Sequence, residues 1–322
     1  MSANQENREG IPAEAPLRVS ACVIIPTKNR PLDLVITLRS LFRQTVLPRE
    51  LVIVDQSAAR DSRDAVDEFY RALPSGQREA VRLLYIHDPA ITGAATARNA
   101  AMDAAGQDYW VFLDDDVIME PDFLEQMLLP LQGDAEIRGV GGIITNYSRP
   151  AFTFRFFHGL FARGPFHDGR QRIYWRAEAL RQTGLVPVSR LGGGLMAFRA
   201  AEVRYLRFDA QLRATSEGED VEFCSQLPAG TRLQVNPRAR LEHKKTPVAR
   251  SGDHWLRAEA RANTYLYRRL WRNRLRHRLC YFWLMSGYAM VAALASVKKL
   301  SAEPWRALLA GMRDSRNTKP KL

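Results

Sequence analysis

The stretch "YWVFLDDDVIMEP" (Tyr109–Pro121) places three consecutive aspartates directly after a run of large apolar residues. The apolar run predicts a buried strand. Because side chains alternate along a strand, Asp114 and Asp116 should point to one side and Asp115 to the other. Two converging carboxylates repel each other unless a cation lies between them, and a hard divalent cation suits such a pair. The spacing leaves open a solvated acidic turn or the cap of a helix that follows Pro121.

The sequence before the aspartates alternates between strand and helix patterns. Short apolar runs predict strands at 21–26, 50–57 and 81–88 in addition to the strand before Asp114, and helical periodicity predicts helices in between. This order predicts an α/β fold with a mostly parallel sheet and helices on both faces. Ligands bind such sheets at the carboxyl ends of the strands. We therefore expect Thr27–Arg30, Asp55–Ser57 and the aspartates to share one edge.

The second half of the chain is less regular. Glycine clusters accompany strand-like runs at 139–146 and 192–200, and the aromatic, basic segment 149–170 reads as a loop able to close over a ligand. Residues 215–227 predict a helix with acids at its start, and one or two strands follow it.

Composition limits the class of protein without choosing its partner. The chain has 322 residues, 46% of them hydrophobic, and a formal net charge of +12. This charge favours an anionic partner, which nucleic acid, a membrane surface or phosphorylated small molecules all satisfy. The three cysteines have no zinc-ligand spacing and fit reduced thiols in a cytosolic protein. Residues 1–19 lack the apolar core of a signal peptide and read as a disordered tail.

Two further residues at strand and helix ends suit nucleotide chemistry. Asp55 ends the second predicted strand, and its carboxylate can accept hydrogen bonds from a nucleobase. Arg98 lies near the start of the helix that precedes the aspartates, where a guanidinium suits a phosphate. The alternatives are a turn cap for Asp55 and plain exposure for Arg98.

Five segments, in this order and spacing, resemble glycosyltransferase family 2 on a GT-A fold. They are "VIIPTKNRPLDLVITLRSLFRQT…ELVIVDQS", "GAATARNAAMDAA", "FLDDDV", "GGGLMAFRA" and "GEDVEFCSQL". The resemblance covers about 20–245. It implies a Rossmann-like catalytic domain over these residues that transfers a sugar from a nucleotide-sugar with inversion.

The resemblance also implies roles for individual residues. Asp220 matches the catalytic base, and Asp114 and Asp116 occupy the DxD positions, where Mn²⁺ or Mg²⁺ bridges the diphosphate. His243 completes the metal or diphosphate site in this interpretation, although a lone histidine is often structural. The expected donor-binding residues are Pro26, Thr27, Asn29, Asp55, Arg98 and Asp114, and the expected acceptor or sugar pocket contains Gly193, Gly194 and Glu219. The crowded acids leave Glu217 and Glu219 open as alternatives for the base.

Residues 246–322 predict a basic, amphipathic helical region. Leu279–Val297 carries no charge and is long enough, at about 1.5 Å per residue, to approach the thickness of a bilayer core. Its tyrosines, serines and alanines favour a peripheral membrane contact over packing on the catalytic domain or a dimer mate, and both over a true span. A peripheral contact would place the protein in the cytoplasm at the inner face of the cell membrane.

The sequence thus predicts a metal-dependent, inverting hexosyl- or deoxyhexosyltransferase. Its expected donor is a UDP- or dTDP-sugar, and its expected acceptor is a glycan or lipid-linked molecule in cell-envelope polysaccharide synthesis. A homodimer stays open, and nucleic acid is not an expected partner. The alternatives are a non-catalytic polyanion- or membrane-binding protein and a sugar nucleotidyltransferase. The latter would need a glycine-rich, basic signature where this chain has "PTKNRP".

Overall fold

The computed structural model describes residues 17–149, 151–174, 176–212, 218–244 and 252–317. The first half forms four adjacent parallel strands in the order β3-β2-β1-β4. These elements are β1 (Leu17–Thr27), α1 (Pro31–Leu41), β2 (Val46–Asp55), α2 (Asp61–Ala72), α3 (Ser75–Ala80), β3 (Arg82–His87), α4 (Ala94–Ala104) and β4 (Tyr109–Leu113). The predicted alternation of strands and helices is confirmed, and β1 begins three residues before the predicted domain start at 20.

The second half extends the same sheet and adds antiparallel pairs. The order continues from β4 through β8, β6 and β9 to β5, with β7 paired to β9. Only the β6–β9 pair is parallel among these additions within the described residues. The elements are β5 (Val117–Met119), α5 (Phe123–Gly133), β6 (Ile137–Ile144), β7 (Val186–Val188), β8 (Leu195–Arg199), α9 (Ala200–Val203), η2 (Ala210–Leu212), α10 (Glu219–Ser225) and β9 (Arg232–His243).

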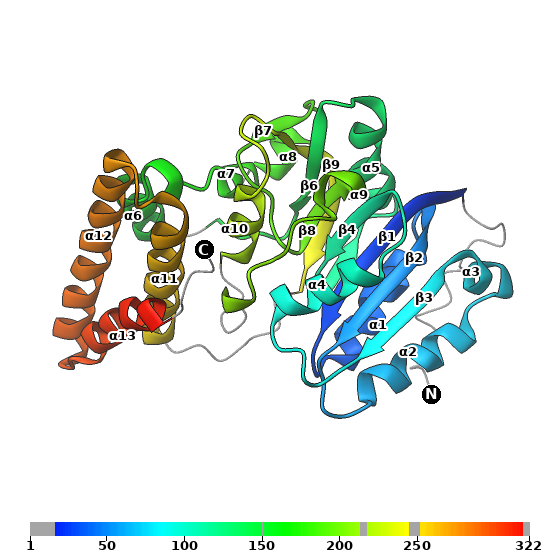
Figure 1. The fold of residues 1–322 in the computed structure, drawn as a ribbon, viewed down its shortest axis with the longest axis horizontal. Helices are drawn as coiled ribbons and strands as arrows, with labels where there is room; N and C mark the ends of the chain where they lie inside the picture. Colours follow the sequence, from blue (N-terminus) through cyan, green and yellow to red (C-terminus); the bar gives the residue numbers. More distant parts are fainter. Residues whose placement is uncertain (1–16, 150, 175, 213–217, 245–251, 318–322) are drawn as a thin grey trace, which may run out of the picture.

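Helices cover both faces of the sheet, as the sequence predicts (Figure 1). One face buries α1 and α5, through residues such as Leu38 and Leu128. The other buries α4 and α10, through Met102 and Phe223. Each large apolar side chain buried in this way contributes about 1.5–3 kcal/mol. Both layers keep the strand ends fixed, and the polar residues that follow those ends build the site.

The aromatic, basic segment 149–170 is not the loop that the sequence suggested. It contains α6 (Phe152–Phe161) and the 3₁₀ turn η1 (Gly164–Phe166). Two short helices, α7 (Arg170–Tyr174) and α8 (Ala177–Leu180), follow it. Phe157 and Phe161 are four residues apart and are therefore on one face of α6, where both are buried. They join a separate core with helices of the C-terminal region. Tertiary packing thus gives this segment a helical structure.

The C-terminal helices and α6 form a helical unit beside the sheet (Figure 1). They are α11 (Gly252–Leu266), a π-helical turn η3 (Tyr267–Trp271), α12 (Leu275–Lys299) and α13 (Glu303–Asn317). Of the helices in the described residues, α12 is long and apolar enough to cross a membrane, and a third of its most apolar window is buried. Its buried face packs on α6, because Gly287 lets the Phe161 ring approach closely. Its other face is exposed.

Candidate active site

The turn between β4 and β5 sends the three aspartates in different directions. Asp115 is buried and accepts hydrogen bonds from Thr27 Oγ1 at 2.6 Å and from Arg30 Nη1 at 3.2 Å. Burial raises the pKa of Asp115 to about 6, although Thr27 and Arg30 oppose the shift. Asp114 and Asp116 instead approach His243 together. Because β4 ends at Leu113, the aspartates lie in the turn that follows the strand, and the turn rather than strand alternation sets their directions.

Asp114, Asp116 and His243 form a candidate metal centre. One possible ligand atom from each residue lies within 4.8 Å of the other two. His243 Nε2 is 2.8 Å from Asp116 Oδ1 and 3.9 Å from Asp114 Oδ2. Two carboxylates and one imidazole fit Mn²⁺ or Mg²⁺ and leave about half of an octahedral coordination shell for oxygens of a ligand.

Strand pairing explains why a residue so distant in sequence reaches the aspartates. Strands β5 and β9 are antiparallel, and Val117 lies opposite His243. Asn146 holds the backbone of His243 with two hydrogen bonds, each 3.0 Å long. The sequence interpretation did not single out Asn146. A side-chain amide at the end of a glycine-rich strand was the only local signal.

Arg30 belongs to the segment that the sequence places at this edge, although no role for it was singled out. Its Nη1 atom lies 2.9 Å from Asp116 Oδ2 and also contacts Asp115, so one guanidinium bridges two of the three acids. Burial alone would raise the pKa of Asp116, but the hydrogen bonds and charges of His243 and Arg30 outweigh it, and the pKa is lowered. Asp116 is therefore held ionised, as a metal ligand requires.

Arg98 is buried rather than exposed, and it connects two acids. Its Nη2 atom donates to Asp114 Oδ1, and its Nη1 atom donates to Glu219 Oε1, both at 3.2 Å. Burial raises the pKa of Glu219 against the opposing charge of Arg98. Glu219 is not among the residues that line the cavity described below, and it reaches the site only through Arg98.

The glycines before β8 permit a close backbone approach. A Cβ atom on Gly194 would lie 1.9 Å from Asp114 Oδ2, and one on Gly193 would lie 3.1 Å from Arg98 Nη1. Neither glycine has a positive φ. Glycine is therefore required at position 194 because there is no room for a Cβ atom, and not because of the backbone conformation.

Asp220 faces the cavity, whereas its neighbour Glu219 faces Arg98. Gly218 adopts a left-handed φ of 87° at the start of α10, which turns the chain into the helix. Asp220 Oδ2 accepts a hydrogen bond from Arg170 Nη1 at 3.0 Å, and Asp168 holds the other side of the same guanidinium. Sequence reasoning missed Arg170 and Asp168, because they belong to the segment interpreted as a loop. Glu217, the other alternative base, lies outside the described residues.

The predicted nucleotide residues are brought together at the ends of β1 and β2. Thr27 lies opposite Asp55 in the sheet. Asp55 is fully buried and accepts hydrogen bonds from Tyr85 Oη at 2.8 Å and from the Ser57 N–H at 2.9 Å. Asn29 has a φ of 55°, and Ser57 Oγ accepts its N–H at 2.7 Å. Pro26 precedes Thr27 on β1. Contacts of these residues with a nucleotide stay a prediction.

A cavity of about 260 Å³ joins the candidate metal centre to Asp220. Asp114 and His243 lie on its wall, as do the three glycines 192–194. Asp168, Arg170 and Asp220 are the other charged residues of the lining. A cation site and a carboxylate able to accept a proton thus share one small space, which is the arrangement needed for displacing an anionic leaving group by a hydroxyl.

The chain is similar to known glycosyltransferases. Residues 22–190 match the sequence profile described as "Glycosyl transferase family 2". The succinoglycan biosynthesis protein ExoM of Rhizobium meliloti (strain 1021) is 27% identical over 234 residues, which are 71% of this chain and 68% of that protein. Validoxylamine A glucosyltransferase of Streptomyces hygroscopicus subsp. limoneus is 28% identical over 154 residues, 47% of this chain and 32% of that protein.

A solved structure shares the fold. The mannosyltransferase PcManGT from Pyrobaculum calidifontis, solved in complex with GDP-Man and Mn²⁺, superposes with a TM-score of 0.57 at 17% identity. The match covers 94% of this chain and 88% of that one. The predicted GT-A fold is thereby confirmed, and the match extends over the C-terminal helices.

Proposed function

Because the chain belongs to glycosyltransferase family 2 and is a nucleotide-sugar glycosyltransferase, we propose that it transfers its sugar with inversion and depends on Mn²⁺ or Mg²⁺. Asp114, Asp116 and His243 would hold the metal ion, and Asp220 is the base. The observation that carries this proposal is that Asp114, His243 and Asp220 line one cavity, while Asp116 lies 2.8 Å from His243. The acceptor is the hydroxyl of a glycan or of a lipid-linked molecule.

The chemistry follows from the positions of the chain's own groups. A bound divalent ion supplies positive charge that stabilises the departing nucleoside diphosphate. Asp220 accepts the proton of the acceptor hydroxyl while that oxygen forms a bond to the anomeric carbon. The bond from this carbon to the diphosphate oxygen breaks on the opposite face of the sugar, so the configuration inverts. Arg98 and Gly194 keep Asp114 in place, and Arg170 orients Asp220.

The two predicted regions divide this work. In this proposal 20–245 is the catalytic domain and 246–322 an accessory region, whose described part, 252–317, is helical. In the accessory region, one exposed side of α12 carries an apolar stripe at helical spacing. The stripe consists of Leu275, Leu279, Phe282, Trp283, Met290, Leu294 and Val297.

This stripe is suited to a membrane surface. Arg276 and Arg278 stand at one end of α12 and Lys298 and Lys299 at the other, and the helix contains no acidic residue. An apolar stripe with basic ends favours peripheral contact with an anionic bilayer. Such contact places the enzyme at the inner face of the cell membrane. The name of the Rhizobium meliloti relative supports a role in polysaccharide synthesis there.

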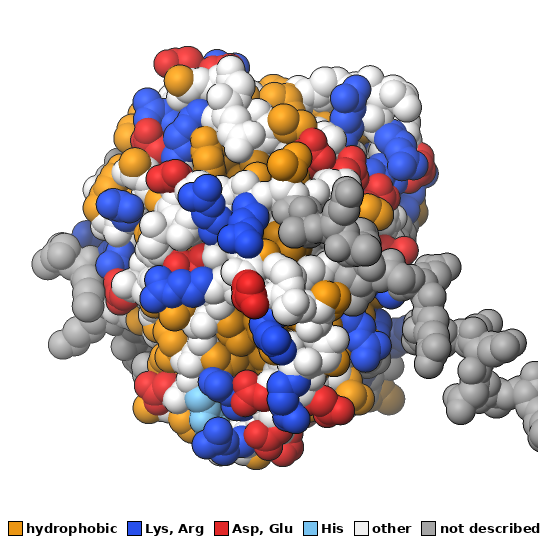
Figure 2. All heavy atoms as spheres, turned by 90° about the vertical axis from the view of Figure 1, so that its right-hand side faces the viewer, with side chains coloured by type: hydrophobic (Ala, Val, Ile, Leu, Met, Phe, Trp, Pro, Cys, Tyr) orange, Lys and Arg blue, Asp and Glu red, His pale blue; other side chains and the backbone are white. Residues whose placement is uncertain are grey.

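The surface charge gives less support to a polyanion-binding protein. Figure 2 shows one face of the molecule, on which Lys and Arg side chains are interspersed with acidic and apolar ones. A nucleic-acid site needs basic residues gathered along a groove or stripe. The Lys and Arg side chains behind the net charge of +12 do not form one continuous basic patch on this face.

The test is turnover with a panel of UDP-, dTDP- and GDP-sugars. Nucleotide release should require Mn²⁺ or Mg²⁺, and proton NMR of the product should show the anomeric configuration opposite to that of the donor. Asp116→Ala should abolish both release and the metal-dependent thermal shift by nucleotide. Metal-independent release, or a product that retains its configuration, would disprove the proposed mechanism.

A further inference from the structure

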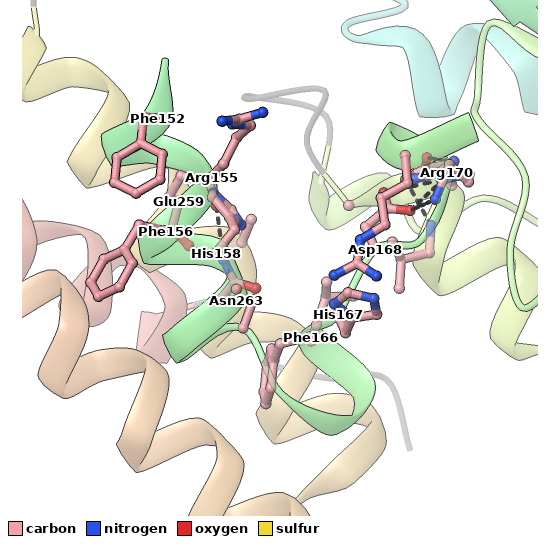
Figure 3. Close-up of a pocket in the computed structure, with 18 residues that line it drawn as sticks. Phe152, Arg155, Phe156, His158, Phe166, His167, Asp168, Arg170, Glu259 and Asn263 are labelled. Atoms are coloured by element: carbon pink, nitrogen blue, oxygen red, sulfur yellow. Dashed lines mark hydrogen bonds and ion pairs between the residues drawn. The ribbon is translucent and has the colours of Figure 1, made fainter. Parts of the chain in front are cut away.

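The helical unit meets the sheet domain, meaning the sheet and the helices packed on it, around a cavity. Figure 3 shows Arg155 of α6 and Asn263 of α11 across an open gap from Asp168 and Arg170. Helix α10, which carries Asp220, also lines this cavity. Because the cavity separates the two parts here, direct contacts beside it must hold α10 and the helical unit together.

Helix α10 depends on such contacts for its position. It has seven residues, and a helix of this length is not stable by itself in water. Phe223 is fully buried in the core against the sheet. Glu219 faces Arg98 on the side of the metal centre. The third contact is made by Glu222, which faces the helical unit.

Arg269 of the π-helical turn η3 joins two acids of the sheet domain to the helical unit. Its Nε atom lies 3.4 Å from Glu222 Oε1 and 3.4 Å from Asp209 Oδ2. Tyr265, one helical turn earlier, donates a hydrogen bond to the same oxygen of Asp209. The side chain of Glu222 is 1% exposed and that of Asp209 is 11% exposed, so salt and water screen these contacts little.

The charge of Arg269 offsets a repulsion between the two acids. Burial, followed by the charge of Asp209, raises the pKa of Glu222, and the charge of Arg269 opposes this shift. Removing Arg269 would take away the cation that lies between two buried carboxylates. The two acids would then favour a separation, and α10 is the element that carries one of them.

Asp209 is a fixed point of the sheet domain. The ring of its neighbour Phe208 stacks on Phe223 of α10, with 4.1 Å between the ring centroids. Asn99 of α4 makes two hydrogen bonds of 2.8 Å with the backbone of Phe208. Arg269 therefore connects α10 to a rigid part of the protein on one side and to the C-terminal helices on the other.

Asp220 and Glu222 point to nearly opposite sides of α10. Residues two positions apart in an α-helix lie about 200° apart around its axis. Asp220 faces the cavities and Glu222 faces Arg269, so a rotation of α10 that releases Glu222 must also move Asp220. Leu266 of α11 restricts the start of the helix, because it lies 3.1 Å from the position of a Cβ atom on Gly218.

We propose that Arg269 is a positioning residue for the transfer reaction. Through Glu222 and Asp209 it fixes the rotation of α10 and so holds Asp220 at the cavity beside the metal centre. Arg269 lines neither cavity, so it acts through α10. The inference rests on the proposed function, because it requires Asp220 to be the base. It gives the C-terminal region a part in catalysis besides membrane contact.

The adjacent Arg268 supplies a matched control. It lies in the same π-helical turn, and its Nη1 atom donates to the carbonyl oxygen of Ser315 in α13 at 2.8 Å. This contact stays within the helical unit. Arg268→Gln and Arg269→Gln therefore remove the same charge from the same turn, and only the second removes the contact with α10.

The first test separates chemistry from donor binding, with the nucleotide-sugar that turns over fastest in the panel above. In Arg269→Gln, kcat for nucleotide release should fall about tenfold or more, because a misplacement of 1 Å at a reacting group costs on the order of 100-fold. The KM for the nucleotide-sugar and the Mn²⁺ affinity should stay within about twofold of wild type, since the metal ligands lie on other elements. Arg268→Gln should keep kcat within about twofold of wild type.

The second test asks whether the contact itself accounts for the loss. Arg269→Lys keeps the positive charge and should recover part of the kcat that Arg269→Gln loses. Glu222→Gln should lower kcat as Arg269→Gln does, and the double variant should lose about as much as either single variant, since both changes break one contact. Tyr265→Phe keeps the ring, removes one hydrogen bond to Asp209 and should give a smaller loss; it replaces Arg269→Gln where that variant does not fold.

Three results would overturn the positioning role. They are a kcat of Arg269→Gln that matches that of Arg268→Gln, equal losses of kcat and of nucleotide-sugar affinity, and losses that multiply in the double variant. Asp220→Asn is measured in the same assay to keep the two proposals apart. Wild-type kcat in Asp220→Asn would refute the base role and with it this inference, whereas an inactive Asp220→Asn beside a fully active Arg269→Gln would refute this inference alone.

Discussion

Adding one methyl group at Gly194 tests how tightly the backbone before β8 defines the metal centre. In Gly194→Ala the new Cβ atom would lie 1.9 Å from Asp114 Oδ2 and 2.1 Å from Asp114 Cγ. Since Cβ atoms essentially never approach another heavy atom within 3.0 Å, the Asp114 carboxylate must retreat by about 1 Å. The φ angle of Gly194 is not in the left-handed region, so alanine at this position adds no backbone strain.

The size of the effect follows from this displacement. A misplacement of about 1 Å at a reacting centre costs on the order of 100-fold in rate, or ~2.7 kcal/mol of barrier. Asp114 also holds Arg98 at 3.2 Å, and a retreat weakens that ion pair. We expect kcat/KM for the nucleotide-sugar to fall about 100-fold and Mn²⁺ affinity to fall at least tenfold.

Two other glycines supply a graded comparison. A Cβ atom on Gly193 would meet Arg98 Nη1 at 3.1 Å, so Gly193→Ala should show an intermediate loss. Gly76 has nothing within 4 Å of its Cβ position and lies in α3, so Gly76→Ala should be neutral or slightly stabilising. Nucleotide release measures kcat/KM. Mn²⁺ affinity is measured by titration, with electron paramagnetic resonance detecting the free ion. Equal values for Gly194→Ala and Gly76→Ala would refute the reasoning.

Three further changes test other contacts. Asp220→Asn should lower transfer by at least 1,000-fold and leave nucleotide binding, measured by calorimetry, within twofold of wild type; loss of both would remove Asp220 from the base role. Asn146→Ala removes two hydrogen bonds from the backbone of His243, so Mn²⁺ affinity should fall about tenfold. Unchanged Mn²⁺ affinity would show that these two hydrogen bonds are not needed to position His243. Burial raises the pKa of Glu259 above its ordinary value of 4.5, so the folded protein holds this proton more tightly than the unfolded chain. The free energy of unfolding should therefore decrease as the pH rises from about 4.5 through the raised pKa. Urea unfolding between pH 5 and pH 8 measures this decrease, which should be smaller in Glu259→Gln. The same pH dependence in wild type and variant would contradict the prediction.

The strand ends were predictable because a local rule determines them. Apolar runs fix the strands, parallel pairing aligns their carboxyl ends, and the polar residues that follow must then meet. Thr27, Asp55 and Asp114 were found in this way. Asp220 and His243 required the order of motifs, since nothing local distinguishes them from a helix start or a structural histidine.

Residues that act through tertiary contacts were not predictable from the pattern. Arg170 reaches Asp220 across 50 positions of sequence, and Glu259 reaches Tyr288 across 29. The α6 segment was interpreted as a loop because its residues are aromatic and basic. Its helix is stabilised by Phe157 and Phe161 packing against the C-terminal helices, which a local reading cannot supply. A cavity of about 620 Å³ forms where α6, α10 and α11 meet.

The run of three aspartates is tolerable because each acid has a cationic or hydroxyl partner from a different part of the chain. Arg30 follows β1, Arg98 lies on α4, and His243 ends β9. Asp115 was expected to point away from its neighbours, and it lies outside the metal triad. Its buried bonds to Thr27 and Arg30 nevertheless fix the direction of the turn. Because these bonds hold the turn, Asp114 and Asp116 can approach His243 together, so the middle acid positions the site that the outer two form.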